Sequence, residues 1–398
     1  MTVNQGSSKK VVLALAIVWL GHFLVDFMIG IWPVHKTIMQ LDIATVGIMS
    51  TIGVVIGEGT QLLFGSLSDG GYRRSVILGG LLATTAATGY AFTDNYYSLF
   101  LLLLMTCLGS GAFHPAAMSI VGSLPSIRKG LFFTIFASGG MAGMASSQII
   151  YTLFHGSPLL STVMLAVPTI ILLIIVMVSR VAESQKLAIE GERRVGISAI
   201  KKFFSDTKLR YVYIMQVCNQ SIFWGTVFLL PDLLSSRGYE AWISFGGGHL
   251  AFTSGCMLLM IPAGYLADKM SPQKILMAAP LVGIVLFYSI LLSPTLPAFA
   301  LLGLLFCLGA AVGVTSPLTI AYGNILMPGN PGVVGAILLG MAWVIAESVG
   351  IGGGGVLTRL FVDDAPAKSL AVLGSAFFFS VLSCYMVQKQ QHKEVAVA

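Results

Sequence analysis

The stretch Gly65-Ser-Leu-Ser-Asp69-Gly-Gly-Tyr-Arg73-Arg74 decides the fold, because it ends a long apolar segment and has a second copy in the chain. The second copy, Gly264-Tyr-Leu-Ala-Asp268, begins 199 residues later and also follows a long apolar segment. Two more pairs recur at nearly the same offset: Cys107-Leu-Gly109 with Cys307-Leu-Gly309, and Pro33 with Pro231. This nearly constant offset indicates that the chain consists of two similar halves.

Composition indicates a membrane protein. Of the 398 residues, 56% are apolar and only 10% are charged, whereas soluble domains carry about 25% charged residues. A helix that crosses the hydrocarbon core needs roughly 20 apolar residues, so the chain has room for about twelve crossings. Long unbroken apolar runs also exclude a membrane barrel, whose strands alternate over about ten residues. We therefore expect an all-α membrane protein and exclude a soluble enzyme.

The apolar runs are bounded by charged residues, glycine and proline. They cover residues 11–34, 45–66, 75–92, 97–122, 131–154, 160–179, 211–234, 245–266, 275–293, 298–326, 333–356 and 367–387. A long polar stretch, 180–210, separates the sixth run from the seventh. We predict an N-terminal six-helix bundle (1–179), a cytoplasmic linker (180–210) and a C-terminal six-helix bundle (211–398). A duplication of this kind predicts pseudo-symmetric bundles with the binding site between them.

Basic residues indicate the orientation of the chain. With the N-terminus in the cytoplasm, 18 of the 22 Lys and Arg residues fall in cytoplasmic segments, as the positive-inside rule requires. The exceptions are Lys36, Arg237, Arg359 and Lys368. We therefore attribute the net charge of +6 to topology and expect no nucleic-acid partner. Both termini are expected in the cytoplasm, and the lipid partner is expected to be a bacterial inner membrane.

The repeated stretch resembles the loop signature of the major facilitator superfamily, in which an acid and basic residues follow the second span. The segment His22-Phe-Leu-Val-Asp26-Phe-Met-Ile-Gly30-Ile-Trp-Pro33 resembles the first span of fosmidomycin-resistance-type transporters, and Gly109-Ser-Gly-Ala-Phe-His114-Pro115 resembles their fourth. The resemblance continues through Arg128-Lys-Gly130 and Gly139-Gly140. It implies the major facilitator fold and secondary active transport.

The superfamily resemblance also implies a cytoplasmic gate. Asp69 matches the signature acid, which is expected to pair with Arg73 or with the N-terminus of a neighbouring helix. The complete expected gate is Gly65, Asp69, Arg73, Arg74 and Asp268.

Ionisable residues inside the predicted spans are few, and such residues usually face a cavity or a partner. His22 and Asp26 are four residues apart and share one helix face. Burial opposes ionisation of a carboxyl, whereas a nearby imidazole favours it, so this pair is suited to binding and releasing a proton. We assign proton coupling to Asp26 and His22, with Glu58 in support. The alternative is structural hydrogen bonding between helices.

Other polar residues in the spans are candidates for substrate binding. His114 precedes Pro115, which is expected to interrupt the fourth span and expose backbone to a cavity. In the C-terminal half, Asn219, Gln220 and Trp224 correspond to the His22–Asp26 stripe, and Glu347 lies one turn after Trp343. Ordinary helix packing is the alternative for each residue. His249 is assigned a structural role.

Several kinds of chemistry are not supported by the sequence. It has no Gly-rich phosphate loop, HExxH or GxSxG motif, so we expect neither ATP hydrolysis, nor enzymatic activity, nor a cofactor. His22, Asp26, Glu58 and His114 are metal-ligand types, but spacing along the chain does not show whether they converge. No metal site is therefore assigned.

We expect a monomeric secondary transporter that exports a small polar drug or metabolite in exchange for protons, and so confers antibiotic resistance. Drug antiporters of the superfamily usually carry Gly-Pro in the fifth span, whereas Gly143 is followed here by Met144. Uptake of a metabolite, siderophore or metal complex is therefore the alternative. A membrane sensor or enzyme is the alternative from another class.

Overall fold

The computed structural model describes residues 5–124, 129–179, 181, 197–269, 271–328 and 330–397. Within these ranges every regular element is a helix. Nine helical stretches within the described residues are long and apolar enough to cross a membrane. One of these, Ile43–Phe92, has 50 residues and allows two crossings. With the 26-residue α6 and the 30-residue α9, they account for the twelve predicted crossings. Much of the predicted linker, 180 and 182–196, lies outside the described residues.

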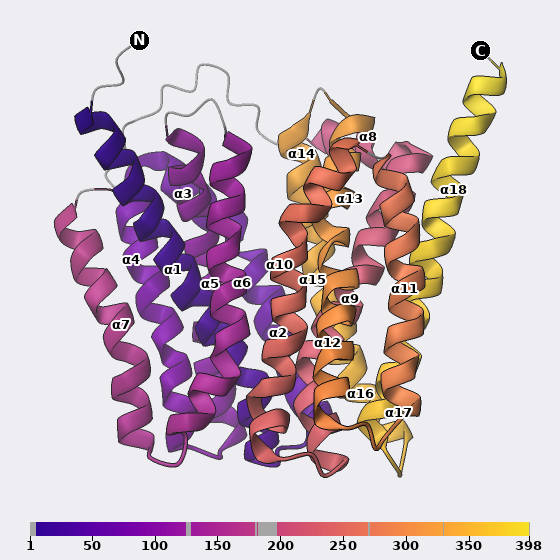
Figure 1. Cartoon of the computed structure of the whole chain (residues 1–398). Coiled ribbons are helices and arrows are strands. Elements are labelled where there is room, and N and C mark those ends of the chain that lie inside the picture. The colour runs from indigo at the N-terminus through magenta and orange to yellow at the C-terminus, as the bar shows by residue number, and fades with distance from the viewer. Residues whose placement is uncertain are drawn as a thin grey trace. The chain divides into compact units, whose positions relative to one another are not determined.

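The chain forms two compact units, and the first comprises Met1–Gln40 and Ile52–Ala188. Its helices, coloured indigo to magenta in Figure 1, run lengthwise beside one another. The elements of this part of the chain are α1 (Gln5–Ile38), α2 (Ile43–Gly59), α3 (Gln61–Leu67), η1 (Ser68–Tyr72), α4 (Arg73–Thr84), η2 (Thr85–Phe92), α5 (Tyr96–Ser123), α6 (Lys129–Phe154) and α7 (Pro158–Ser179).

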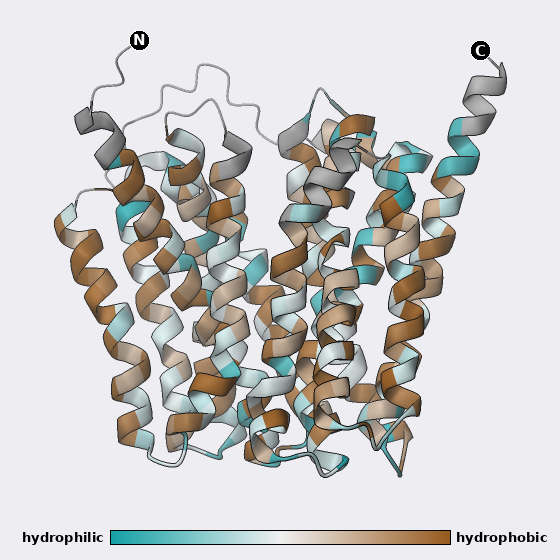
Figure 2. Ribbon diagram, in the orientation of Figure 1, coloured by the Kyte–Doolittle hydropathy of each residue, from teal (hydrophilic) through white to brown (hydrophobic). Residues whose placement is uncertain are grey.

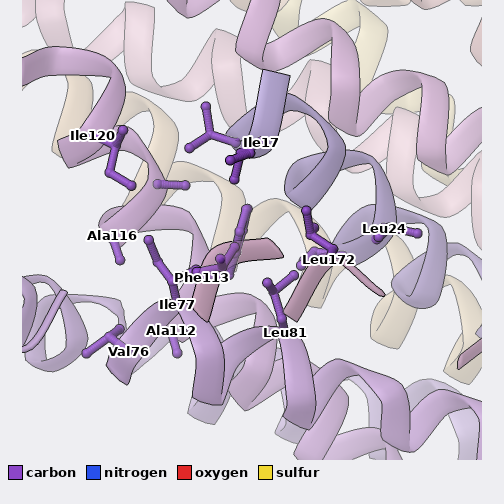
Figure 3. Packing of buried hydrophobic residues seen from close by; sticks show 14 of the residues in the cluster. Ile17, Leu24, Val76, Ile77, Leu81, Ala112, Phe113, Ala116, Ile120 and Leu172 are labelled. Atoms are coloured by element: carbon purple, nitrogen blue, oxygen red, sulfur yellow. The ribbon is translucent and has the colours of Figure 1, made fainter. Parts of the chain in front are cut away.

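The core of the first unit lies among α1, α4, α5 and α7. Leu81 of α4 and Phe113 of α5 are fully buried there, with Ile17 of α1 and Leu172 of α7 beside them (Figure 3). A methyl group at Gly21 of α1 would lie 2.7 Å from the Phe113 ring. The small residue therefore lets α1 approach α5.

The loop signature forms a bend between α3 and α4. Gly71 has φ of +103°, a conformation that glycine adopts without the steric cost paid by other residues. The chain changes direction between Asp69 and Arg73 as a result.

The second unit comprises Leu41–Thr51 and Ile189–Ala398, so it includes the first turns of α2. Its other elements are α8 (Ile197–Ser205), α9 (Thr207–Ser236), η3 (Ile243–Gly247), α10 (Gly248–Lys269), α11 (Pro272–Leu292), α12 (Ala298–Gly313), α13 (Thr315–Leu326), α14 (Pro331–Gly335), η4 (Ala336–Met341), α15 (Ala342–Glu347), η5 (Ser348–Gly353), α16 (Gly354–Leu357), η6 (Thr358–Leu360), α17 (Ala365–Leu373) and α18 (Ser375–Val397).

Glycines bring helix backbones together at equivalent places in the two units. In the first unit, a Cβ at Gly57 of α2 would lie 2.6 Å from the carbonyl oxygen of Cys107 in α5. In the second unit, a Cβ at Gly255 of α10 would lie 2.0 Å from the carbonyl oxygen of Phe306 in α12. Small residues let membrane helices approach this closely and gain van der Waals contact. The second span therefore packs on the fourth in both units.

The first turns of α2 are fastened to the end of the eleventh span within the second unit. A Cβ at Gly47 would lie 3.0 Å from the carbonyl oxygen of Ile351, so the two backbones nearly touch. Arg359 donates to Asp42 at 2.8 Å. The hydrogen bond from the Thr45 hydroxyl lowers the pKa of the Asp42 carboxyl below its ordinary value, and Arg359 contributes further.

Apolar side chains cover the outer faces of the helices. Brown, hydrophobic residues predominate along α7 and α11 in Figure 2, and Leu159, Ile171 and Val178 of α7 are more than half exposed. Exposed apolar surface on this scale suits contact with lipid, because a soluble monomer rarely carries a large apolar patch.

Replacing Gly255 with alanine tests the close crossing of α10 and α12. The added methyl would meet a backbone oxygen, so the helices must separate, and overpacking of this kind costs about 1–3 kcal/mol. We expect Gly255→Ala to lower the thermal unfolding temperature of the purified protein in detergent. Gly303→Ala is the matched control, because nothing lies within 4 Å of the added atom there. If Gly255→Ala and Gly303→Ala unfold at the same temperature, α10 and α12 do not cross as closely at Gly255 as the structure indicates.

Candidate functional site

Ionisable residues from two helices meet inside the first unit. Asp26 and His22 lie one turn apart on α1, and His114 lies on α5. His22 Nε2 is 3.3 Å from Asp26 Oδ2, and His114 Nε2 is 3.3 Å from Asp26 Oδ1. The Asp26 carboxylate therefore lies between two imidazoles, with one ring nitrogen near each oxygen. We call these three residues the His–Asp–His cluster.

Backbone carbonyls orient both imidazoles. His22 Nδ1 lies 2.8 Å from the carbonyl oxygen of Phe136 in α6, and His114 Nδ1 lies 2.9 Å from that of Ser110, one turn earlier in α5. A carbonyl oxygen only accepts hydrogen bonds, so each Nδ1 carries a hydrogen and donates it. Each Nε2 therefore faces Asp26 with either a second hydrogen or a lone pair. Because a lone pair would repel the carboxylate, the arrangement favours a cation at these contacts.

The surroundings of the cluster limit its movement. The Phe136 ring stacks on His22 with ring centres 4.2 Å apart, and His114 meets His22 edge-on at 4.9 Å. Gly140 of α6 closes the remaining side, where a Cβ would lie 2.3 Å from both His22 Nε2 and Asp26 Oδ2. The cluster therefore requires glycine at position 140.

Glu58 is connected to the cluster through one intermediate residue. The Ser110 hydroxyl donates to Glu58 Oε1 at 3.5 Å and lies 3.2 Å from His114 Nδ1. Glu58 is on α2, so three helices contribute to this group of side chains. The sequence prediction placed Glu58 with Asp26 and His22 but did not identify Ser110 as the link.

The sequence prediction missed Ser110 and Gly140 as site residues. Only a local pattern of a few residues marks each of them in the sequence. Ser110 lies four residues before His114, a spacing that places the two on one helix face. Gly140 belongs to the Gly139-Gly140 pair, which stands out in the sequence only through the family resemblance. Its contact with His22 and Asp26 depends on how α6 packs against α1, and no pattern within a single helix encodes that contact.

The fourth span is continuous, contrary to the prediction that Pro115 interrupts it. α5 runs as one helix from Tyr96 to Ser123 with Pro115 inside it. Proline removes only its own N–H from the helix ladder, and neighbouring helices support such a position in a membrane protein. His114 is therefore positioned by a regular helix rather than by a break.

Four of the predicted gate residues, Gly65, Asp69, Arg73 and Arg74, flank the bend at Gly71. Asp69 and Arg73 are not joined within the described residues. Asp69 accepts a hydrogen bond from Ser119 of α5 at 3.4 Å. Arg73 is buried, and Arg74 donates to the carbonyl oxygen of Met177 in α7. Gly65 lies against Pro115 of α5, since a Cβ at position 65 would lie 3.5 Å from the proline Cβ. The side chain of Asp268 is outside the described part of the chain.

The C-terminal candidates belong to the second unit. The Trp224 and Trp343 rings meet edge-on with centres 6.2 Å apart, which joins α9 to α15. Asn219, Gln220 and Glu347 are buried. Both amide atoms of Asn219 lack a hydrogen-bond partner among the residues that the structure describes. His249 is buried as well.

The four basic residues that fall outside the predicted cytoplasmic segments contact groups within their own units. Lys36 is fully buried and donates to Thr37. Arg237 donates to the carbonyl oxygens of Ile290 and Leu291. Arg359 is paired to Asp42, and Lys368 Nζ lies 5.9 Å from the centre of the Phe361 ring, so all four cations contact protein groups.

The cluster also provides a set of atoms that suits a metal. One ligand atom each from His22, Asp26 and His114 can be chosen so that all lie within 4.8 Å of one another. The convergence that sequence spacing left open is therefore present in the structure for these three residues.

Gly140→Ala tests the geometry of the cluster. The new methyl would occupy the space between His22 and Asp26, so one of them must move, at a cost of about 1–3 kcal/mol. We expect a lower unfolding temperature and a longer His22–Asp26 distance in a structure of the variant. Gly79→Ala serves as the control, since its Cβ meets nothing within 4 Å. An unchanged distance in Gly140→Ala would show that position 140 does not confine the pair.

Comparisons with solved structures place the fold among transporters. A bacterial homologue of the human lysosomal transporter Spinster, inward-facing and unoccupied, superposes with a TM-score of 0.76 at 14% identity, covering 97% of each chain. The nucleoside transporter NupG superposes with a TM-score of 0.73 at 13% identity, covering 96% of this chain and 98% of that one. At such identities the likeness concerns the fold alone.

Sequence comparisons agree with that fold. The chain is 22% identical over 298 residues to the uncharacterized MFS-type transporter YfkF of Bacillus subtilis (strain 168), which covers 73% of each chain. The family model of the Major Facilitator Superfamily matches residues 11–351. The protein is therefore an integral membrane transporter that belongs to the Major Facilitator Superfamily.

Proposed function

We propose that this protein exports a small polar drug or metabolite in exchange for protons. The observation that carries the proposal is the His–Asp–His cluster, in which Asp26 lies 3.3 Å from an imidazole nitrogen on either side. Ionisable residues are expensive inside a membrane and are usually functional. A purely structural hydrogen bond would require one donor, whereas this cluster brings together three ionisable groups.

The geometry suits the binding and release of protons. With Nδ1 of His22 and His114 committed to backbone carbonyls, protons bind at Nε2 or at the carboxylate. A proton on Nε2 gives a charge-assisted hydrogen bond to Asp26, which is stronger than a neutral one. Loss of the proton leaves a lone pair facing the carboxylate. The proton occupancy of the cluster therefore changes how strongly α1 is held to α5.

Ser110 extends this effect to Glu58. Its hydroxyl donates to Glu58 and lies beside His114, so a change in the charge of Glu58 reaches the cluster through a single side chain. We therefore propose Asp26 and His22 as the principal coupling residues, with Glu58 in support and His114 as part of the same site.

The second unit supplies our proposed substrate contacts. Asn219 and Gln220 offer amide groups, Trp224 and Trp343 offer indole faces and N–H donors, and Glu347 offers a carboxylate. The predicted spans contain a single Lys or Arg, Lys368, which is the second residue of the last span. This composition favours a neutral or cationic polar compound over a multivalent anion, because the spans offer a carboxylate and amides but almost no Lys or Arg to bind an anion.

Uptake is the second candidate, and the fifth span favours it. Gly143 packs against the carbonyl oxygen of Phe23 in α1 and is followed by Met144 rather than by the proline usual in drug antiporters. Compounds entering rather than leaving cells that express the protein would identify this direction.

Asp26→Asn tests proton coupling, because it removes the charge and keeps the size of the side chain. The measurement is efflux of a panel of polar antibiotics, including fosmidomycin, from cells that lack their own exporters, with and without an imposed pH gradient. Wild-type protein is expected to export at least one compound, and Asp26→Asn is expected to reduce the gradient-driven rate at least tenfold. The control is Asp94→Asn, an exposed acid that should leave efflux unchanged.

Two results would contradict the proposal. If gradient-driven efflux by Asp26→Asn equals that of wild type, Asp26 does not couple protons to transport. If wild-type efflux is the same with and without the gradient, protons do not drive the transporter. Both conclusions require that the wild type and the variants are present in the membrane in equal amounts, which an immunoblot measures.

A further inference from the structure

We propose that His22, Asp26 and His114 bind a divalent transition-metal ion, with Zn²⁺ as the representative case. All three supply one ligand atom within 4.8 Å of the others. This inference goes beyond the proposed transport function and does not require it, although it concerns the same residues.

Distances within the cluster suit such an ion. Zn²⁺ lies about 2.0–2.2 Å from nitrogen and oxygen ligands. An ion at that distance from two atoms 3.3 Å apart subtends an angle of about 105°, close to the tetrahedral value that zinc prefers. The remaining separation is 4.8 Å or less, so an ion that binds all three atoms would draw the outermost ligand atom inward.

The hydrogen bonds around the cluster provide an independent argument. Histidines that bind metals usually donate their second ring N–H to a carboxylate or a backbone carbonyl, which fixes the ring and directs the other nitrogen at the metal. His22 does so through the Phe136 carbonyl and His114 through the Ser110 carbonyl. Both Nε2 atoms are thereby directed at Asp26. The two histidines therefore have the hydrogen bonds that orient histidine ligands in known metal sites.

Gly140 packs directly against two of the ligand atoms. A Cβ at this position would lie 2.3 Å from His22 Nε2 and 2.3 Å from Asp26 Oδ2, so any larger residue would displace both. The absence of a side chain at position 140 therefore keeps these two ligand atoms in place beside each other.

The ligand types indicate which ion would bind. Two imidazoles and one carboxylate suit borderline cations such as Zn²⁺, Co²⁺ and Ni²⁺, whereas Mg²⁺ and Ca²⁺ prefer oxygen ligands. Three protein ligands leave a fourth tetrahedral position open, which a donor atom of a polar cargo would complete. Metal and proton would compete for the same Nε2 lone pairs.

Binding of Zn²⁺ alone to the purified full chain, without a polyhistidine tag, tests the site by titration calorimetry. Co²⁺ absorption reports the coordination geometry in the same samples. We expect one ion per chain and at least a tenfold weaker affinity in His22→Gln, His114→Gln and Asp26→Asn. Gly140→Ala keeps all three ligands and is expected to weaken binding as well. The control is His155→Gln, because His155 follows α6 outside the cluster and donates to the Thr152 carbonyl.

Each outcome decides the proposal. Failure of the wild type to bind Zn²⁺, or equal affinities in the cluster variants and His155→Gln, would overturn it. Only variants that melt like wild type without metal are compared, and the three ligand variants provide independent chances to meet that condition. If Asp26→Asn loses gradient-driven efflux but keeps its Zn²⁺ affinity, the metal site is overturned and the proposed proton coupling is unaffected. If Asp26→Asn keeps gradient-driven efflux but loses Zn²⁺ affinity, proton coupling is overturned and the metal site is supported.

Discussion

A carboxylate among apolar helices needs hydrogen-bond donors or a positive charge beside it, and this constraint governs the centre of the first unit. Removing an ion from water costs several kcal/mol even after the protein relaxes, and Asp26 offsets that cost with an imidazole on either side. The backbone carbonyls of Phe136 and Ser110 hold the two rings in place. Asp26 therefore lies at the centre of a set of contacts that joins α1, α5 and α6.

Close helix packing is what makes this arrangement attainable. Gly21 admits the Phe113 ring, and Gly140 admits the His22–Asp26 pair, so α5 and α6 both approach α1 closely. Without a hydrophobic driving force between helices in lipid, such contacts depend on small residues and on hydrogen bonds. The glycines thus serve the site directly, since a methyl group at position 140 would occupy the space that the cluster uses.

Much of the fold was predictable because its physical causes are local or periodic. Apolar runs of about 20 residues and the repeat at an offset of 199 residues predicted twelve helices in two similar halves, and the structure confirms the all-helical fold. The four-residue spacing of His22 and Asp26 predicted a shared helix face. Pro115 was expected to break α5, and that prediction was wrong because neighbouring helices support a proline in place. Asp69 and Arg73 were expected as one possible pair, but within the described residues Asp69 accepts from Ser119 instead.

The sequence by itself determined the membrane setting, the helix count and the residue types able to carry charge, since each follows from composition and spacing along one chain. Only the tertiary structure decided which of those residues meet. His114 reaches Asp26 from a different helix, far along the chain, Ser110 links Glu58 to them, and Gly140 borders the pair from α6. Contacts across helices depend on which faces pack together, and that choice is made by the shapes of many side chains at once.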